Sequence, residues 1–457
     1  MSDSSGTFGK IGEAFSSASA SIAFVGNSAN YGVGPDFFLS DYRVVCLDYS
    51  PLVDALRGAG RSVFCLEEEL GEQNALFRNT TRLLGHERSI EYLKAEGTTH
   101  LMIFKPSSKV ELAAAANGWR ILASPSSLAQ RLENKFNLEE IAGRAGVKPP
   151  LSAIFRAEEA DFDRLAFKVG LPFVVQAAKG FAGGKTFLVG SPSDFKEAME
   201  RARSRVLKAS MLIAGMPVTV NAVVTPRGVA VGWPAYQITG RPECTPNPLG
   251  SCGNDLAFGA LGGRLREVRG VAVRVGEVIG EMGYRGLFGV DVVVSPRGPV
   301  LIEINPRMTA SLPLHTVLSI EREKIPLLAF HLADFLGLDL VSDMGAIEDD
   351  QERVEAASVV IYNLEEAPVQ VVGELEAGVY RLDENEELAY VRRGTSIADC
   401  RSPDEVFISA AAKGKSINPD VEIARIYLRR GVLAPSEDFH PEIKLLIDAV
   451  KRKLLVP

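Results

Sequence analysis

Two acidic residues twelve positions apart, Asp291 and Glu303, carry the clearest chemical signal in the sequence. The apolar runs on either side of Ser-Pro-Arg-Gly-Pro predict two antiparallel strands joined by a short turn. With the turn centred on Arg297, the two acids become direct cross-strand neighbours whose side chains lie roughly 5 Å apart. Two carboxylates that face each other are destabilising unless a cation lies between them. The pair therefore predicts a cation site, on condition that no bulge shifts the register.

The second strand enlarges this polar patch. Alternation predicts Ile302 and Ile304 on one face and Glu303, Asn305 and Arg307 on the other. Hard oxygen ligands that leave room for water and phosphate suit Mg²⁺, with Mn²⁺ as an alternative, and an arginine can grip an anion beside the metal. The competing interpretation is a solvent-facing hairpin with solvated acids. It fits the apolar flanks less well, because buried carboxylates need partners.

Composition excludes several classes of protein. A chain of 457 residues has room for about two to four domains with an ample core. A net charge of −8 without Lys/Arg runs argues against nucleic-acid binding. No apolar stretch is long enough to cross a bilayer, and the start lacks the features of a signal peptide. The five cysteines lack metal-binding spacing, which predicts thiols in a cytoplasmic protein; Cys244 and Cys252 share a loop, where a disulfide or reactive thiol is the less favoured alternative.

Short apolar runs between residues 21 and 127 predict an α/β layer of buried parallel strands. Residues 1–20 are expected to form a flexible tail or a short helix. The loop from Gly26 to Gly34 lacks G-x-G-x-x-G spacing, so a dinucleotide site is disfavoured. The runs that predict strands are Ile22–Val25, Val44–Leu47, Ser62–Cys65 and Leu101–Phe104.

A glycine-rich loop between two strands follows a predicted helix over residues 127–145. The strands are predicted at residues 173–176 and 186–189. Gly184-Lys185-Thr186 imitates a P-loop but runs into a strand instead of a helix, so the Walker interpretation is poor. Bare backbone N–H groups on a mobile lid can still cover triphosphate oxygens, with Lys179 or Lys185 adding charge. The alternative is an ordinary hairpin with a mobile tip.

Further elements are predicted toward the C-terminus. They are a hairpin at residues 218–224 and 229–233, a helix from about Leu265 to Met282, a solvated linker at residues 342–355, strands at residues 357–362, 378–382 and 387–391, and a closing helix at residues 441–455.

The run Glu303-Ile304-Asn305-Pro306-Arg307 resembles the metal-binding signature of the ATP-grasp ligases, and the resemblance spans about residues 128–338. In that superfamily an acidic residue on one strand and Glu-x-Asn on the next hold the magnesium ions of MgATP, positions that Asp291, Glu303 and Asn305 match. The resemblance implies that Arg307 holds a substrate carboxylate or the acyl phosphate. It also implies nucleotide contacts from Lys135, Gln176, Lys179, Gly180, Gly183, Gly184, Lys185, Met211 and Ile213.

Two positions depart from the family pattern. Gln176 stands where a lysine is usual, and Met211 opens a hinge that usually reads Glu-x-Ile-x-Gly. Gln176 can hydrogen-bond adenine or phosphate but brings no charge. Hinge contacts to adenine are largely main-chain, so Met211 need not abolish them. The polar loop at residues 240–255 lies where family members border the acceptor site, and Arg241 and Asp255 are predicted substrate contacts, with plain loop residues as the alternative.

The resemblance implies an α/β and α+β protein: an N-terminal α/β domain at residues 21–127 beside the substrate cleft, a two-lobed ATP-grasp core at 128–341, and a linker with a small mixed C-terminal domain at 342–457. Lys105 is expected to be solvated rather than to point into the cleft.

The implied activity is ATP-dependent ligation of a small-molecule carboxylate to an amine through an acyl phosphate, with release of ADP and phosphate. A homodimer is left open. The alternatives are an ATP-grasp enzyme with another acceptor, carboxylase-like or a phosphoryl transferase, and a nucleotide-binding protein that has lost catalysis.

Overall fold

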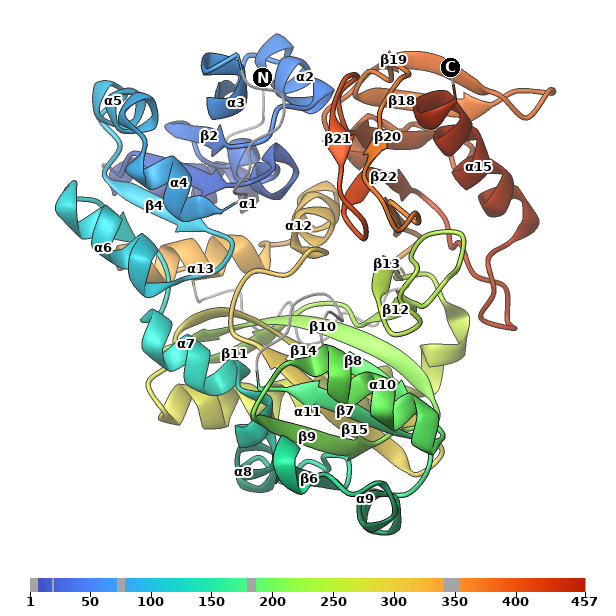
Figure 1. The fold of residues 1–457 in the computed structure, drawn as a ribbon. Helices are drawn as coiled ribbons and strands as arrows, with labels where there is room; N and C mark the ends of the chain where they lie inside the picture. The colour runs from blue at the N-terminus through green and yellow to red at the C-terminus, as the bar shows by residue number, and fades with distance from the viewer. Residues whose placement is uncertain (1–6, 19, 72–78, 179–185, 341–353, 457) are drawn as a thin grey trace.

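A computed structural model describes residues 7–18, 20–71, 79–178, 186–340 and 354–456 of the chain. Within these residues the backbone forms a parallel sheet of five strands, an antiparallel sheet of four, a larger sheet of eleven and a two-stranded ribbon. The N-terminal and C-terminal regions lie at one end of the molecule, and the four-stranded sheet lies at the other (Figure 1). The predicted mixture of α/β and α+β structure is confirmed.

The N-terminal region forms a parallel sheet in the order β3-β2-β1-β4-β5. Each predicted run is a strand, because apolar side chains on both faces are buried under helices. Residues 7–17 form helix α1, whose Ile11 and Phe15 are buried, so the short helix is the correct alternative to a flexible tail there. The strands are β1 (Ile22–Gly26), β2 (Tyr42–Cys46), β3 (Ser62–Cys65), β4 (His100–Ile103) and β5 (Arg120–Ile121), and the larger helices are α2 (Pro51–Gly58), α4 (Thr80–Gly85), α5 (Glu87–Ala95) and α6 (Ser108–Ala116).

The next region is a small antiparallel lobe with strand order β6-β9-β7-β8. Two helices pack on one face of its sheet, and Phe173, Phe195 and Leu207 form part of the core between them. The opposite face carries polar side chains, among them Gln176 and Lys208. The elements are β6 (Ser152–Arg156), α9 (Phe162–Val169), β7 (Phe173–Ala177), β8 (Thr186–Val189), α10 (Pro192–Ala202) and β9 (Val206–Met211).

Residues 212–215 connect this lobe to the large sheet. Its strand order is β15-β14-β10-β12-β13-β16-β22-β20-β18-β19, with β11 paired to β10. The hairpin predicted at residues 218–224 and 229–233 is confirmed, because β10 pairs with β11 and Thr225 lies opposite Gly228. The strands of residues 216–305 are β10 (Met216–Thr225), β11 (Gly228–Val231), β12 (Ala235–Thr239), β13 (Ser251–Asp255), β14 (Gly286–Ser295) and β15 (Gly298–Asn305).

The C-terminal strands continue the same sheet, because β16 pairs with β13. The two backbones approach closely at Gly253, where a side-chain Cβ would lie 2.0 Å from the carbonyl oxygen of Ser358 and where φ is +143°. Only glycine meets both conditions without strain. The elements are β16 (Ala357–Tyr362), β17 (Val369–Gln370), β18 (Gly378–Leu382), β19 (Leu388–Arg393), β20 (Val406–Ala410), β21 (Ser416–Ile417), β22 (Glu422–Leu428) and helix α15 (Pro441–Leu455).

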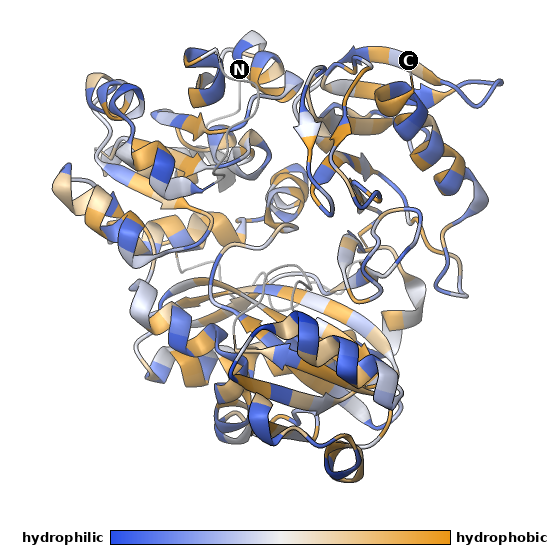
Figure 2. Ribbon diagram, viewed as in Figure 1, coloured by the Kyte–Doolittle hydropathy of each residue, from blue (hydrophilic) through white to orange (hydrophobic). Residues whose placement is uncertain are grey.

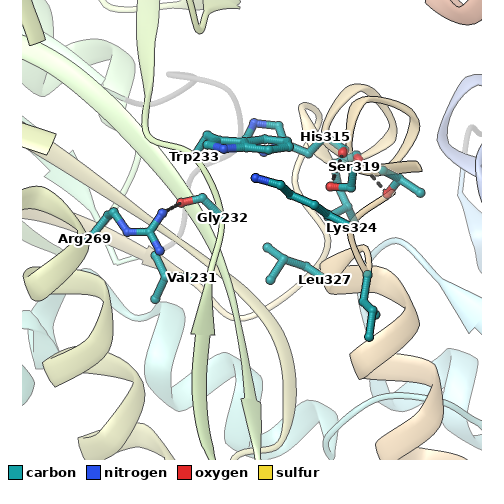
Figure 3. A pocket seen from close by; sticks show the side chains of 11 residues that line it. Val231, Gly232, Trp233, Arg269, His315, Ser319, Lys324 and Leu327 are labelled. Carbon is teal, nitrogen blue, oxygen red and sulfur yellow. Dashed lines mark hydrogen bonds between the residues drawn. The ribbon is translucent and has the colours of Figure 1, made fainter. Parts of the chain in front are cut away.

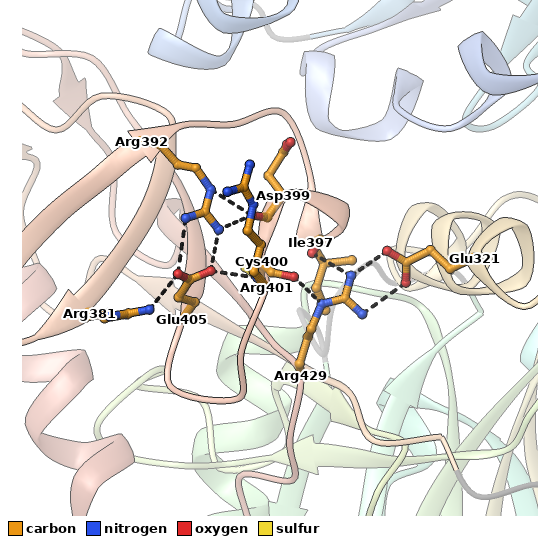
Figure 4. A network of polar contacts seen from close by, with 9 residues as sticks. All are labelled: Glu321, Arg381, Arg392, Ile397, Asp399, Cys400, Arg401, Glu405 and Arg429. Carbon is orange, nitrogen blue, oxygen red and sulfur yellow. Dashed lines mark hydrogen bonds and ion pairs between the residues drawn. The ribbon is translucent and has the colours of Figure 1, made fainter. Parts of the chain in front are cut away.

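Helices fill the space around the large sheet. Colouring by hydropathy shows many apolar residues along its strands (Figure 2). A polar network ties the C-terminal region to α12, since Arg429 donates to Glu321 at 3.1 Å and to the carbonyl oxygen of Cys400 at 2.7 Å (Figure 4). The helices are α11 (Leu265–Glu281), α12 (Leu312–Glu321) and α13 (Leu327–Leu336).

All five cysteines are buried free thiols, including Cys244 and Cys252. Among the described helices, none is both long and apolar enough to cross a bilayer. Residues 341–353, which hold most of the predicted solvated linker, lie outside the described part of the chain.

Candidate functional site

The two acids of the predicted cation site are direct partners, Asp291 on β14 and Glu303 on β15. The turn itself differs from the prediction. Ser295 pairs with Gly298, so its centre lies half a residue before Arg297. The register then shifts between Asp291 and Val292, where a bulge adds one residue to β15. The two departures cancel, and the predicted pairing is confirmed.

The bulge changes which side chains enter the core. Leu301 and Ile304 are buried in the main hydrophobic cluster, whereas Ile302 is only half-buried. The predicted strict alternation with Ile302 and Ile304 on one face is therefore wrong at Ile302. The extra residue of a bulge lies outside the regular ladder, so its side chain does not follow the alternation.

Electrostatics around the two carboxylates favour a cation. Burial and the neighbouring Glu303 raise the pKa of Asp291 to about 6, while hydrogen bonds from Thr219 and Asn305 and the charge of Arg307 oppose the rise. Asn305 Nδ2 donates to Asp291 Oδ2 at 3.0 Å. Two acids held this close repel each other when both are ionised, and a bound cation relieves that repulsion.

A lysine from a distant segment already lies against this pair. Lys135 Nζ donates to Glu303 Oε2 at 2.7 Å, and both side chains are mostly buried. Lys135 reaches the hairpin because the predicted helix over residues 127–145 is broken. Helix α7 (Ser126–Glu133) ends at Asn134, the short 3-10 helix η3 (Lys135–Asn137) follows, and α8 (Leu138–Arg144) continues the chain. The Asn134 side chain accepts a hydrogen bond from the backbone N–H of Phe136 at 3.0 Å, which caps the new start.

Arg307 lies beside the pair, as the resemblance implies. Its Nη2 donates to Asn305 Oδ1 at 2.9 Å, and its Nε lies 3.5 Å from Glu133 Oε1. Glu133 also accepts from Lys105 Nζ at 2.7 Å. Lys105 is therefore paired rather than merely solvated, and it points toward the site. Sequence reasoning missed Glu133, because a lone acid at a helix end carries no motif.

Two aromatic side chains of the N-terminal region extend from Arg307. The guanidinium lies 5.4 Å from the ring centre of Phe104, and Phe104 packs on Tyr31 with ring centres 4.7 Å apart. The Tyr31 hydroxyl accepts from Arg425 Nη2 at 3.2 Å. Arg425 belongs to β22, so side chains from the N-terminal, central and C-terminal regions meet next to Arg307.

Apart from Lys135, the residues expected to contact nucleotide fall into two groups. Gln176, Met211 and Ile213 lie on the small lobe and its connection to the large sheet. Gln176 Nε2 donates to Thr186 Oγ1 at 3.2 Å. The connection turns tightly at Gly215, where φ is +155° and a Cβ would lie 2.4 Å from the carbonyl oxygen of Val294. The second group, Lys179, Gly180, Gly183, Gly184 and Lys185, lies outside the described residues.

The two predicted substrate contacts in the polar loop have structural partners. Asp255 is fully buried, and it accepts hydrogen bonds from the backbone N–H groups of Val432 at 2.8 Å, Leu433 at 3.1 Å and Ala257 at 2.9 Å. These bonds hold the chain after β22, so Asp255 has a structural role, and the substrate contact expected of it stays a prediction. Arg241 donates to the carbonyl oxygen of Glu437. Its contact with substrate stays a prediction.

A pocket lies away from these groups, among α11, β11, α12 and α13 (Figure 3). Trp233, His315, Lys324 and Leu327 line it, and none of the predicted site residues does. Among the described residues, neither ring nitrogen of His315 has a hydrogen-bond partner. Burial lowers the pKa of His315 to about 4, so the ring is neutral at physiological pH.

The donor set of the hairpin fits magnesium. Among the described residues no three or more His, Cys, Asp or Glu side chains are grouped so that they could hold a metal ion by themselves. The hairpin instead offers the two carboxylates of Asp291 and Glu303 and the amide of Asn305. Mg²⁺ commonly takes one or two carboxylates from a protein and fills its other positions with water and phosphate oxygens. The set therefore suits a metal that arrives with a nucleotide.

Comparison with known proteins identifies the fold. The family described as ATP-grasp domain matches residues 132–311. Comparison with curated protein sequences found no match.

Solved structures of low sequence identity share the architecture. An N5-carboxyaminoimidazole synthase from Aspergillus clavatus, solved with ADP and 5-aminoimidazole ribonucleotide, superposes with a TM-score of 0.59 at 15% identity over 95% of this chain and 100% of that one. A biotin carboxylase from Campylobacter jejuni in complex with β-γ-ATP gives 0.62 at 14% identity, over 90% and 88% of the two chains. The biotin carboxylase domain of a Hydrogenobacter thermophilus 2-oxoglutarate carboxylase, a dimer solved with MgADP, ADP and bicarbonate, gives 0.59 at 13% identity, over 89% and 86%. Residues 132–311 therefore match the ATP-grasp domain family, and most of the chain shares the fold of these structures.

Proposed function

We propose that the protein is an ATP-dependent ligase that joins a small-molecule carboxylate to an amine. The observation that carries the proposal is the direct pairing of Asp291 with Glu303, with Lys135 bound to Glu303 and Arg307 bound to the neighbouring Asn305. The two carboxylates could bind a cation that carries phosphate, and the Arg307 guanidinium could bind a second anion beside it. Both are needed when a carboxylate is activated by phosphoryl transfer.

The reaction would take place in two steps. A substrate carboxylate oxygen attacks the γ-phosphorus of ATP, the bond to the bridging oxygen breaks, and ADP leaves. The amine nitrogen then attacks the carbonyl carbon of the acyl phosphate, inorganic phosphate leaves, and the nitrogen loses a proton to give the amide. Positioning and charge neutralisation supply most of the rate in such transfers.

Each residue of the site has a part in this scheme. Asp291, Glu303 and Asn305 would hold magnesium, which neutralises charge on the transferring phosphoryl group when it is bound. The Lys135 ammonium would draw phosphate oxygens toward the hairpin. Arg307 would hold the carboxylate and then the acyl phosphate through its planar fork, with Glu133 and Asn305 fixing its plane.

The test is product analysis with the full chain. The protein is incubated with MgATP and pooled carboxylates and amines, and ADP, phosphate and new masses are followed by chromatography and mass spectrometry. We expect ADP only in the presence of a carboxylate, and a product whose mass equals acid plus amine minus water. Binding of ATP without ADP formation on any pool would instead favour a nucleotide-binding protein that has lost catalysis.

A second candidate is carboxylation, with bicarbonate as the activated acid. It is supported by the whole-chain similarity to an N5-carboxyaminoimidazole synthase and by a similar biotin carboxylase domain solved with bicarbonate. The same assay separates the two candidates. ADP formation that requires bicarbonate, with a product that carries an added carboxyl group, would favour carboxylation over amide formation.

A further inference from the structure

A buried lysine lies on the face of the small lobe that turns away from its helices. Lys208 is in β9 and is 2% exposed. Its neighbours Leu207 and Ala209 pack into the core under α9 and α10. Because side chains alternate along a strand, Lys208 points to the opposite face of the sheet.

No acid forms an ion pair with Lys208 among the residues that the structure describes. Lys208 Nζ donates to the carbonyl oxygen of Lys135 at 2.9 Å. Burial lowers the pKa of Lys208, a nearby Glu139 raises it, and the Lys135 ammonium lowers it further. By contrast, Lys415, which is similarly buried, forms an ion pair with Glu67 at 2.5 Å. Buried charges are normally paired, so Lys208 points to an anion that belongs to a ligand.

The residues around Lys208 indicate the chemical class of such a ligand. It is the direct cross-strand partner of Gln176, and β7 and β9 lie side by side in the small lobe (Figure 1), so the two side chains share a face. Lys208 contacts the backbone of Lys135, whose own ammonium reaches Glu303 at 2.7 Å. The backbone N–H of Lys135 donates to the carbonyl oxygen of Ala178, the residue after β7, at 3.3 Å. Lys208 thus places a positive charge on the same face of the sheet as Gln176, which is neutral.

We propose that Lys208 is a phosphate-binding residue of the nucleotide site. The inference rests on the proposed function, because it requires that MgATP binds between the small lobe and the hairpin. An ammonium has three donors, and one of them is used by the Lys135 carbonyl oxygen. The remaining donors can meet triphosphate oxygens, while Lys135 serves the oxygens nearer to Glu303.

The experiment compares Lys208→Met with a matched control, Lys168→Met, in the full chain. Lys168 is exposed in α9 on the helix-covered side of the same lobe, so both variants lose one positive charge from one lobe. Affinities for MgATP, MgADP and adenosine are measured by titration calorimetry, and Tm is measured without ligand. For Lys208→Met we expect the Kd of MgATP and MgADP to rise at least about tenfold, since a charged hydrogen bond is lost. The affinity for adenosine should not change, and Tm should hold or rise, because an unpaired buried charge has been removed.

The outcomes separate this inference from the function on which it rests. An unchanged MgATP affinity in Lys208→Met overturns the phosphate role. So does an equal loss of MgATP and adenosine affinity with a lower Tm, because that pattern belongs to a structural lysine. An equal rise of the MgATP Kd in Lys168→Met would attribute the effect to net charge and overturn it too. If the unmodified protein does not bind MgATP at all, the proposed function fails and the inference fails with it.

Discussion

At the scale of single residues, the proposed chemistry depends on the charges gathered around Glu303. Glu303 faces Asp291 and accepts from Lys135 at 2.7 Å. Glu303→Gln keeps the shape of the side chain but removes one of the charges that would offset magnesium. We expect turnover to fall by about 100-fold or more, because charge stabilisation by a metal supplies several kcal/mol. Steady-state rates of ADP formation give the measurement.

Stability should respond differently to the same substitution. The loss of the Lys135 ion pair and the relief of repulsion with Asp291 act in opposite directions, so Tm without nucleotide should hold or rise. Glu140→Gln, at an exposed position of α8, serves as the control and should change neither quantity. Near-normal turnover in Glu303→Gln would remove the hairpin from the chemistry.

Arg307 allows a test of geometry against charge. Its guanidinium contacts Asn305, Glu133 and the carbonyl oxygen of Met308, a planar arrangement that an ammonium cannot reproduce. Arg307→Lys should therefore lower turnover by about tenfold or more, while MgATP affinity stays near that of the unmodified protein. Parallel loss of turnover and MgATP affinity would assign Arg307 to the triphosphate instead of the acyl group.

At the scale of elements, the hairpin of β14 and β15 could be predicted only in part from the sequence. Strand identity and the pairing of Asp291 with Glu303 followed from apolar runs and a Ser-Pro-Arg-Gly-Pro turn. The turn centre and the bulge at Ile302 did not, because each depends on backbone geometry that several sequences can adopt. The shifted turn and the bulge change the register in opposite directions, so Asp291 still pairs with Glu303. Ile302 is the extra residue of the bulge, and its face was therefore predicted wrongly.

The break between α7 and α8 is a second feature that periodicity could not reveal. Leu128, Leu132 and Phe136 recur every four residues across Asn134, so the pattern predicted one continuous helix. The break places Lys135 against Glu303 and Glu133 against Arg307. Long-range ion pairs of this kind leave no local trace in the sequence. Lys208 went unnoticed for the same reason, because a strand lysine alone gives no sign of its burial.

The capping role of Asn134 can be tested directly. Asn134→Ala removes the acceptor for the Phe136 N–H, which should lower the free energy of unfolding by about 1 kcal/mol. It should also weaken MgATP binding severalfold, because Lys135 is no longer held toward the hairpin. Asn134→Asp retains a capping oxygen and should keep most of the stability. Denaturant titration and calorimetry measure the two effects, and an unchanged MgATP affinity in the alanine variant would separate the cap from the site.

At the scale of the whole molecule, the continuous sheet is the feature least accessible from sequence. The strands predicted at residues 357–362 and 378–382 are found at those positions, yet nothing local indicated that β16 pairs with β13. Such pairing joins segments about a hundred residues apart, and only the folded arrangement defines it. Likewise, nothing in the sequence indicated that Asp255, at the end of β13, accepts hydrogen bonds from the backbone N–H groups of Val432 and Leu433.

A buried ion pair links the N-terminal region to the C-terminal region. Lys415 Nζ lies 2.5 Å from Glu67 Oε2, with side-chain exposures of 4% and 2%, and Glu67 also accepts from the backbone N–H of Tyr49 at 2.6 Å. Lys415→Met should lower the free energy of unfolding by about 3–5 kcal/mol, because it leaves the Glu67 charge buried and without its cation. Arg201→Met, which breaks an exposed pair with Glu197, should cost less than about 1 kcal/mol.

The double substitution decides whether charge or packing carries that effect. Glu67→Gln combined with Lys415→Met removes both charges, so the chain should regain much of the stability lost in Lys415→Met, because no uncompensated ion remains. Denaturant unfolding of the four chains in this cycle gives the coupling free energy. A double variant as unstable as Lys415→Met alone would show that the lysine acts through its packing, and the N-terminal and C-terminal regions would then be held together by their apolar contacts rather than by this pair.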